Sequence, residues 1–311
     1  MRGIRIVKTA RALPQKCMTN DELCEFVDSN DEWIKKRTGI EKRYVCTDEN
    51  SVSLAIEATK KVLNASKINK EEIGAIVVAT TTQENLFPSV ACSIQNELDF
   101  PTEIMAFDMN AACAGFLYGI SVCKGLLETL NKRYILLVGS ENLTGIVDYN
   151  DRSSCILFGD GAAAIILELS DKMYHQRLWA DGNFDALHCQ GVKHPGAKIF
   201  MDGNKVFRFA VTALQDVLEK ILMDMSLTID DVDYVVCHQA NKRIIDYVAA
   251  KYPGNEAKFY TNIMHYGNTS SASIPIALDE MYEKNMLREG MKIVLIGFGG
   301  GFTYSGAILE L

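Results

Sequence analysis

The sequence predicts an α/β protein in which the second half of the chain repeats the first. Residues 76–80 resemble residues 234–238, and residues 135–139 resemble residues 293–297, with both pairs 158 residues apart. These segments are continuous aliphatic runs, which are typical of strands in a sheet covered on both faces. We therefore predict a duplicated fold whose layers alternate α-β-α-β-α.

The predicted elements follow the same order in both halves. A helical spacing of apolar residues over 53–67 precedes the first strand, and a similar pattern over 209–225 precedes its counterpart. A short acidic turn then leads into each strand.

A second helix of each half is predicted after a turn of small residues, at 110–115 and 267–271. Cys113 and Ser271 are also 158 residues apart, so they occupy matching places in the two halves. Matching turns of paired halves lie near a common pseudo-two-fold axis, and such a crevice favours an active site.

These patterns divide the chain into three segments. Residues 1–170 form a half that carries Cys113, and residues 201–311 form a half that carries His238 and Asn268. Residues 171–200 are polar and contain three glycines and a proline, so we predict a connection that ends near a strand at 197–201.

Composition limits the classes of function. The chain has 311 residues, 48% hydrophobic residues and a net charge of −8, so nucleic acid is disfavoured as the main partner. Its apolar runs are all shorter than the roughly 20 residues that span a bilayer, and the first residues lack the pattern of a signal peptide. Nine irregularly spaced cysteines without a CxxC pair favour a reduced compartment. We expect a cytoplasmic protein that does not enter membranes.

Cys113 is the candidate nucleophile. It follows a predicted strand at 104–109 and stands at the expected start of a helix, between small residues that leave room for a substrate. The helix dipole and its unpaired N–H groups would lower the pKa of a thiol at this place. A packed core cysteine is the alternative interpretation.

Two polar residues of the second half are candidates to act with Cys113. His238 stands at the carboxyl end of a buried strand, where α/β sheets commonly bind ligands, and the duplication turns this end towards the same axis. A hydrogen-bonded core histidine is the alternative. Asn268 lies in a Gly-Asn turn, which alone indicates little.

Two further patterns concern possible ligand sites. The run 297–302, with three consecutive glycines, lacks the GK[ST] and the following helix of a phosphate loop, so a backbone turn that binds an oxyanion is preferred. Uneven spacing within the connection argues against zinc, and we predict no metal, although potential ligands occur at His175, His188, Cys189 and His194.

Together these residues resemble β-ketoacyl-acyl carrier protein synthase III, a thiolase-fold condensing enzyme. The resemblance runs in order along nearly the whole chain, through residues 31–34, 37–40, 87–89, 112–116, 158–162, 238–241, 266–270 and 298–303. It implies a thiolase-like fold, a homodimer, no cofactor, and acyl-coenzyme A and acyl carrier protein as partners.

The resemblance also implies roles for individual residues. Cys113 would take the acyl group, His238 and Asn268 would stabilise the enolate, and the N–H groups of Cys113 and Gly300 would form the oxyanion hole. Phe87 would close the acyl pocket from across the dimer and favour short acyl groups. Coenzyme A contacts are implied for Trp33, Arg37, Arg152, Gly203, Phe207 and Asn241. A basic patch for the carrier protein is implied at Arg208, Lys242, Arg243 and Lys251.

The expected reaction is condensation of a short acyl-coenzyme A with malonyl-acyl carrier protein, with loss of carbon dioxide, to start fatty acid synthesis. An alternative is a polyketide- or quinolone-type homologue, or an acyltransferase, with the same Cys-His-Asn site. A non-catalytic scaffold on this fold would be expected to lack part of that site, which is complete here.

Overall fold

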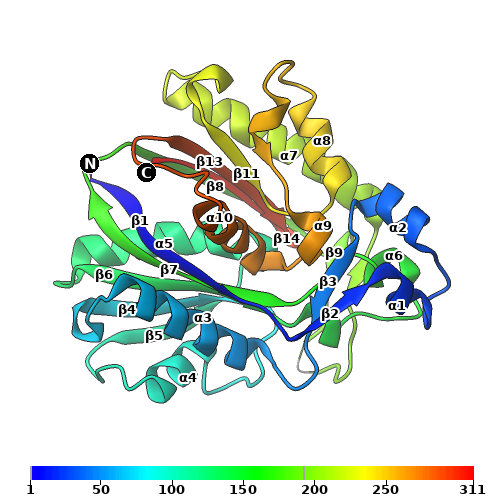
Figure 1. Cartoon of the computed structure of the whole chain (residues 1–311), viewed down its shortest axis with the longest axis horizontal. Helices are drawn as coiled ribbons and strands as arrows, with labels where there is room; N and C mark the ends of the chain where they lie inside the picture. The colour runs from blue at the N-terminus through cyan, green and yellow to red at the C-terminus, as the bar shows by residue number, and fades with distance from the viewer. Residues whose placement is uncertain (1, 192) are drawn as a thin grey trace.

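The computed structural model describes residues 2–191 and 193–311 and places two five-stranded sheets one above the other (Figure 1). The first sheet has the order β1-β7-β6-β4-β5, with β4, β5 and β6 parallel. Its strands are β1 (Gly3–Ala12), β4 (Ile73–Ala79), β5 (Met105–Met109), β6 (Tyr134–Glu141) and β7 (Gly161–Ser170). Every residue of β4 and β6 is buried, which explains their continuous aliphatic sequences.

The second sheet repeats this order. It runs β8-β14-β13-β11-β12, so each strand has a counterpart in the first sheet at the same place. Its strands are β8 (Tyr174–Asn183), β11 (Tyr234–Cys237), β12 (Phe259–Tyr260), β13 (Lys292–Gly299) and β14 (Gly301–Glu310). Strands β6 and β13 begin and end 158 residues apart, as do the 3-10 turns η2 (Ala112–Ala114) and η6 (Ser270–Ala272). The predicted duplication is confirmed.

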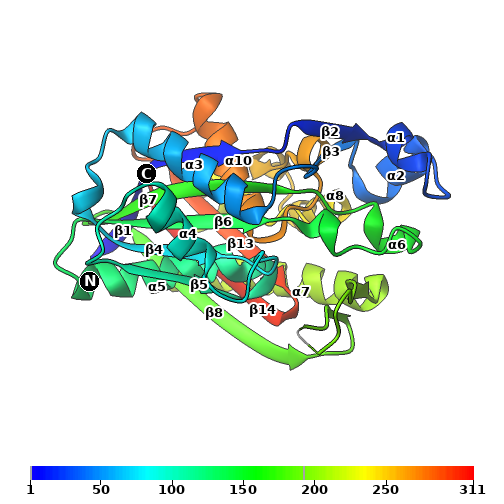
Figure 2. The same cartoon turned by 90° about the horizontal axis from the view of Figure 1, so that it is seen from below.

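Helices form the other three layers (Figures 1 and 2). Helices α3 (Ser51–Ser66) and α4 (Val90–Glu97) cover the outer face of the first sheet, and α7 (Gly203–Asp224) and α8 (Lys242–Ala249) cover that of the second. Helices α5 (Gly115–Thr129) and α10 (Ser273–Glu283) fill the space between the sheets and pack in an apolar core there. The predicted five-layered α/β fold is therefore confirmed.

Some of the remaining elements gather beside the sheets, to the right in Figure 1, around a smaller apolar core. They include the hairpin of β2 (Lys16–Thr19) and β3 (Lys42–Val45) with α1 (Asn20–Cys24), α2 (Asp31–Thr38) and α6 (Arg152–Cys155). The short elements are η1 (Lys70–Glu72), η3 (Leu143–Gly145), β9 (Leu187–His188), β10 (Phe200–Met201), η4 (Ile229–Asp231), η5 (Glu256–Lys258) and α9 (Ile263–Tyr266).

The segment predicted as a connection contains part of the second sheet. Strand β8 lies within residues 171–200 and pairs with β14 as an edge strand. Its side chains are largely solvent-exposed, so it has no aliphatic run by which it could be recognised. The expected strand at 197–201 is reduced to β10, which pairs with β9. The domain boundaries at 170 and 200 stay a prediction.

Two expectations from composition can be compared with the structure. All nine cysteines are free thiols. In residues 2–191 and 193–311, no helix combines the length and the apolar character needed to cross a membrane.

Candidate active site

The nucleophile turn joins β5 to α5. Asn110 Oδ1 accepts a hydrogen bond from the N–H of Ala112 (3.0 Å), and Ala112 takes a left-handed conformation with φ of 47°. A non-glycine residue in this region costs roughly 1–3 kcal/mol and is commonly found at functional sites. The turn η2 then leads into α5, with Cys113 one residue before Ala114, the N-cap of that helix.

The matching turn of the second half has the same backbone. Ser270 also has φ of 47°, and η6 leads into α10 as η2 leads into α5. Ser271, the counterpart of Cys113, is buried, and its hydroxyl contacts the carbonyl of Ala79 and a carboxylate oxygen of Glu141, both at 2.8 Å. The two turns are thus alike in shape, but only the first presents a thiol.

The thiol of Cys113 is not acidic in this structure. Burial raises its pKa to about 12, while a hydrogen bond with the Ser270 hydroxyl lowers the pKa in part and the nearby Glu141 raises it further. The expected lowered pKa is therefore wrong, because loss of solvation outweighs the hydrogen bonds that lower the pKa.

His238 follows β11 and is 1% exposed. Its Nδ1 lies 2.7 Å from the hydroxyl of Ser273, and the ring of Phe298 lies 5.6 Å away, edge to face. Burial lowers the pKa of His238 to about 3, so the imidazole is neutral at physiological pH. The adjacent Gln239 fixes this turn, because its side-chain amide donates to the carbonyl of Cys237 and its Oε1 accepts from two backbone N–H groups.

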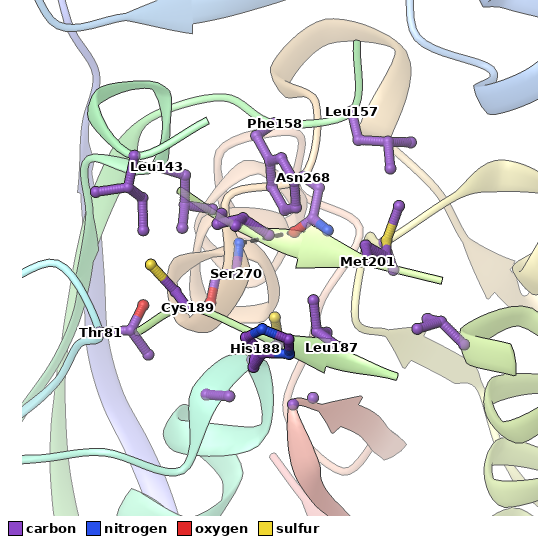
Figure 3. Close-up of a pocket in the computed structure, with 18 of the residues that line it drawn as sticks. Thr81, Leu143, Leu157, Phe158, Leu187, His188, Cys189, Met201, Asn268 and Ser270 are labelled. Carbon is purple, nitrogen blue, oxygen red and sulfur yellow. Dashed lines mark hydrogen bonds between the residues drawn. The ribbon is translucent and has the colours of Figure 1, made fainter. Parts of the chain in front are cut away.

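Asn268 is held on three sides. Its backbone N–H donates to the carbonyl of Leu157 (2.8 Å), and its carbonyl accepts from Gly159 (3.1 Å). Its side-chain Oδ1 accepts from the N–H of Ser270 (2.9 Å), the dashed line in Figure 3. Because Oδ1 is occupied, the amide NH2 is the end of the side chain that remains to donate.

The β13–β14 turn lies against the nucleophile. A Cβ built on Gly299 would stand 2.5 Å from the backbone nitrogen of Cys113, so this approach requires glycine. The Thr303 hydroxyl donates to the carbonyl of Ala111 (2.7 Å) and lies 3.2 Å from that of Gly300. The polyglycine run therefore borders Cys113, as expected for a backbone oxyanion site.

A single cavity of about 1790 Å³ brings most of the predicted residues together. Figure 3 shows part of its wall. Of the predicted site residues, the cavity is lined by Trp33, Arg37, Cys113, Gly203, Phe207, His238, Asn241, Arg243, Asn268 and Gly300.

The remaining predicted residues lie outside the wall of the cavity. The guanidinium of Arg152 lies 5.1 Å from the centre of the Trp33 ring and that of Arg37 lies 5.6 Å from it, so Arg152 contacts a residue of the cavity wall. Phe87 is 85% exposed. The other residues outside are the expected carrier contacts Arg208, Lys242 and Lys251, of which Lys242 pairs with Asp246 at 2.6 Å.

Glu141 borders the site and was not predicted. It ends β6, is fully buried, and accepts hydrogen bonds from Thr81 and from the hydroxyl of Thr82 (2.7 Å). Burial raises its pKa. The available signal was an acidic residue three positions after the aliphatic run 135–138.

The histidines and cysteine considered as metal ligands are divided. His188, Cys189 and His194 line the cavity, whereas His175 pairs with Asp224 at 2.7 Å. Across residues 2–191 and 193–311, His, Cys, Asp and Glu side chains form no group of three that could hold an ion.

Comparisons with known proteins identify the family of the chain. Residues 107–182 match the family described as 3-oxoacyl-[acyl-carrier-protein (ACP)] synthase III, and residues 222–311 match its C-terminal family. The chain is 42% identical to β-ketoacyl-[acyl-carrier-protein] synthase III of Clostridium novyi, covering 100% of this chain and 99% of the relative. The enzyme of the same name from Clostridium acetobutylicum is 40% identical, and the match again covers 100% of this chain and 99% of the relative.

Solved structures show the same similarity. That of 3-oxoacyl-[acyl-carrier-protein] synthase III from Aquifex aeolicus superposes with a TM-score of 0.94 at 35% identity, covering 99% of this chain and 100% of that one. The priming β-ketosynthase of the R1128 polyketide pathway has a TM-score of 0.92 at 32% identity, covering 99% and 96%.

Proposed function

Because this chain belongs to the 3-oxoacyl-[acyl-carrier-protein] synthase III family, we propose that it starts fatty acid synthesis by condensing a short acyl-coenzyme A with malonyl-acyl carrier protein. The observation that supports this most directly is the meeting of a thiol, a neutral imidazole and an oriented amide, from Cys113, His238 and Asn268, at one cavity.

The first step transfers the acyl group. The sulfur of Cys113 attacks the thioester carbon, the bond to the coenzyme A sulfur breaks, and the thiol proton ends on the released coenzyme A. N–H groups of Cys113 and Gly300 would stabilise the tetrahedral oxyanion, as preorganised donors do. Covalent capture divides the transfer into two easier steps.

The second step forms a carbon–carbon bond. The malonyl thioester loses carbon dioxide, and the electron pair moves into an enolate whose oxygen accepts hydrogen bonds from His238 and Asn268. The carbanion attacks the acyl-cysteine carbon, and the Cys113 thiolate leaves and regains a proton. Neutral donors suit this chemistry, because decarboxylation requires stabilised negative charge rather than a strong base. The thiol, imidazole and amide supply every group used, so the proposed reaction requires no resident cofactor.

Coenzyme A is proposed to enter past Trp33. The Trp33 ring, close to the guanidinium groups of Arg37 and Arg152, offers a stacking surface for a base, and both cations suit phosphate. Further contacts are proposed for the cavity-lining Gly203, Phe207 and Asn241.

The carrier protein is proposed to dock on α7 and α8, near Arg208, Lys242, Arg243 and Lys251. Arg208 and Arg243 are exposed, and the guanidinium of Arg243 lies 5.5 Å from the Phe207 ring at the cavity. Lys242 contributes less charge to this surface, because Asp246 partly neutralises it.

A homodimer is proposed because Leu86 and Phe87 leave large apolar surfaces exposed, at 66% and 85%. Such side chains are expected to be covered by a second copy, which would place Phe87 at the partner's acyl pocket. Sedimentation velocity should give twice the mass of the chain, and Phe87→Asp should weaken the association. Nine free thiols support the further proposal of a cytoplasmic location.

Product analysis with acetyl-coenzyme A and malonyl-acyl carrier protein tests the function. Acetoacetyl-acyl carrier protein should form, and Cys113→Ser should form neither acyl-enzyme nor product. Acylation of Cys113 without release of carbon dioxide would instead identify an acyltransferase. A preference for longer or unusual primers would favour a polyketide-type role, which the similarity to the R1128 ketosynthase keeps as the second candidate.

A further inference from the structure

The first residue of α10 contacts the candidate catalytic histidine. Ser273 is 3% exposed, and its hydroxyl lies 2.7 Å from Nδ1 of His238. The same oxygen accepts a hydrogen bond from the backbone N–H of Gln239 at 3.3 Å. Helix α10 and the turn after β11 are therefore joined at this hydroxyl.

The positions of the protons follow from counting donors. A backbone N–H can only donate, so Ser273 Oγ is the acceptor from Gln239. Among residues 2–191 and 193–311, the only acceptor in contact with the Ser273 hydroxyl proton is Nδ1 of His238. A serine hydroxyl carries one proton, and leaving it unpaired in a buried place is destabilising.

We propose that Ser273 is a positioning residue that donates its hydroxyl proton to Nδ1 of His238 and thereby holds the imidazole in the tautomer protonated on Nε2. The opposite tautomer would leave the Ser273 hydroxyl without an acceptor in the described part of the chain. The histidine is neutral, so one ring nitrogen carries a proton and the other a lone pair.

The tautomer decides what His238 offers to the substrate. Nδ1 is occupied by Ser273, so Nε2 is the nitrogen left to face the cavity that His238 lines. Protonated Nε2 donates to an enolate oxygen, whereas unprotonated Nε2 would direct a lone pair at developing negative charge. This consequence rests on the proposed function, but the tautomer itself does not.

A related contact orients the second donor. The N–H of Ser270 holds Oδ1 of Asn268 and leaves its NH2 to donate (Figure 3). Residues 270–273 therefore contact both candidate donors, through a backbone N–H in one case and a side-chain hydroxyl in the other. Of the two supporting groups, the Ser273 hydroxyl is the one that belongs to a side chain, so it can be removed without altering His238 or Asn268.

Nitrogen NMR of the ligand-free enzyme with 15N-labelled imidazoles tests the tautomer. The chain has five histidines, so the signals of His238 are identified by their loss in His238→Asn. In the wild-type enzyme Nδ1 should have the shift of an unprotonated nitrogen and Nε2 that of a protonated one. The reverse pattern, or an equal mixture, would overturn the proposal whether or not any variant folds.

Two variants test the consequence. Ser273→Ala should give a mixture of tautomers and lower the rate of malonyl decarboxylation about tenfold, less than the roughly 100-fold or larger loss from removal of an oxyanion donor. Ser273→Thr keeps the hydroxyl and should restore both the tautomer and the rate. Acylation of Cys113 is the internal control and should be unchanged in both variants.

The outcomes separate the two proposals. An unchanged tautomer and rate in folded Ser273→Ala would contradict the role of Ser273. The expected tautomer in a wild-type enzyme that forms no acetoacetyl product would instead contradict the proposed function alone.

Discussion

Cys113 and His238 are both disfavoured in their charged forms. Burial raises the pKa of Cys113 to about 12 and lowers that of His238 to about 3. At neutral pH the ligand-free site therefore holds a thiol and a neutral imidazole. Each group makes a testable prediction about pH.

Alkylation tests the thiol of Cys113. With a pKa of about 12, the thiolate fraction grows about tenfold for each pH unit, so the iodoacetamide rate should rise steadily from pH 7 to pH 10. Peptide mapping by mass spectrometry isolates this cysteine from the other eight. A plateau of the alkylation rate near neutral pH would show that the start of α5 lowers the pKa of Cys113 more than burial raises it.

The condensation step tests His238. Its lowered pKa means that the ring stays neutral at every pH above about 5. With enzyme already acylated on Cys113, the single-turnover rate should not change between about pH 5.5 and pH 8 through this histidine. An inflection near 6.5, the ordinary value for histidine, would contradict the buried neutral ring.

At the scale of elements, the close contact of β13 with the η2 turn positions the nucleophile. The Cβ added by Gly299→Ala would overlap the backbone nitrogen of Cys113. A backbone atom cannot move aside as the end of a flexible side chain can. We expect a loss of about 1–3 kcal/mol in unfolding free energy and about 100-fold in kcat, as for a shift of about 1 Å in catalytic geometry. Urea unfolding and steady-state kinetics measure the two effects.

Gly125→Ala is the matched control. Gly125 lies in α5, and a Cβ there meets open space, so alanine should raise helix stability by up to about 1 kcal/mol and leave kcat unchanged. Equal losses in both variants would mean that the contact at Gly299 has no special role.

The elements also show what sequence can predict. Strands β4, β6, β11 and β13 were recognised because they are buried runs with a fixed offset. Strand β8 was missed because an edge strand with exposed polar side chains has no such run. The position of Cys113 before a helix identifies it as a candidate. Its raised pKa could not be predicted, because burial depends on segments distant in sequence. Glu141 and Ser273 were missed for the same reason.

At the scale of the molecule, charge must be unevenly distributed if an acidic carrier protein is to bind. The chain has a net charge of −8, which opposes the approach of such a partner. Arg208→Glu should raise KM for malonyl-acyl carrier protein about tenfold at low salt, with little change in kcat or in KM for acyl-coenzyme A. The effect should shrink as salt screens the charges.

Lys220→Glu provides the control on the same helix. Lys220 is exposed and lies over Trp179, in the last turns of α7, whereas Arg208 lies near its start. Lys220→Glu changes the net charge by the same amount as Arg208→Glu. An equal rise in KM for malonyl-acyl carrier protein would therefore indicate long-range repulsion rather than a docking surface.

The paired turns have a further consequence for stoichiometry. Each chain contains two turns of one shape, yet the second presents Ser271, enclosed by Ala79 and Glu141, where the first presents Cys113. A chain should therefore take up one acyl equivalent and no more, however large the excess of donor. The second turn, which carries no thiol, therefore has a structural role beside the first.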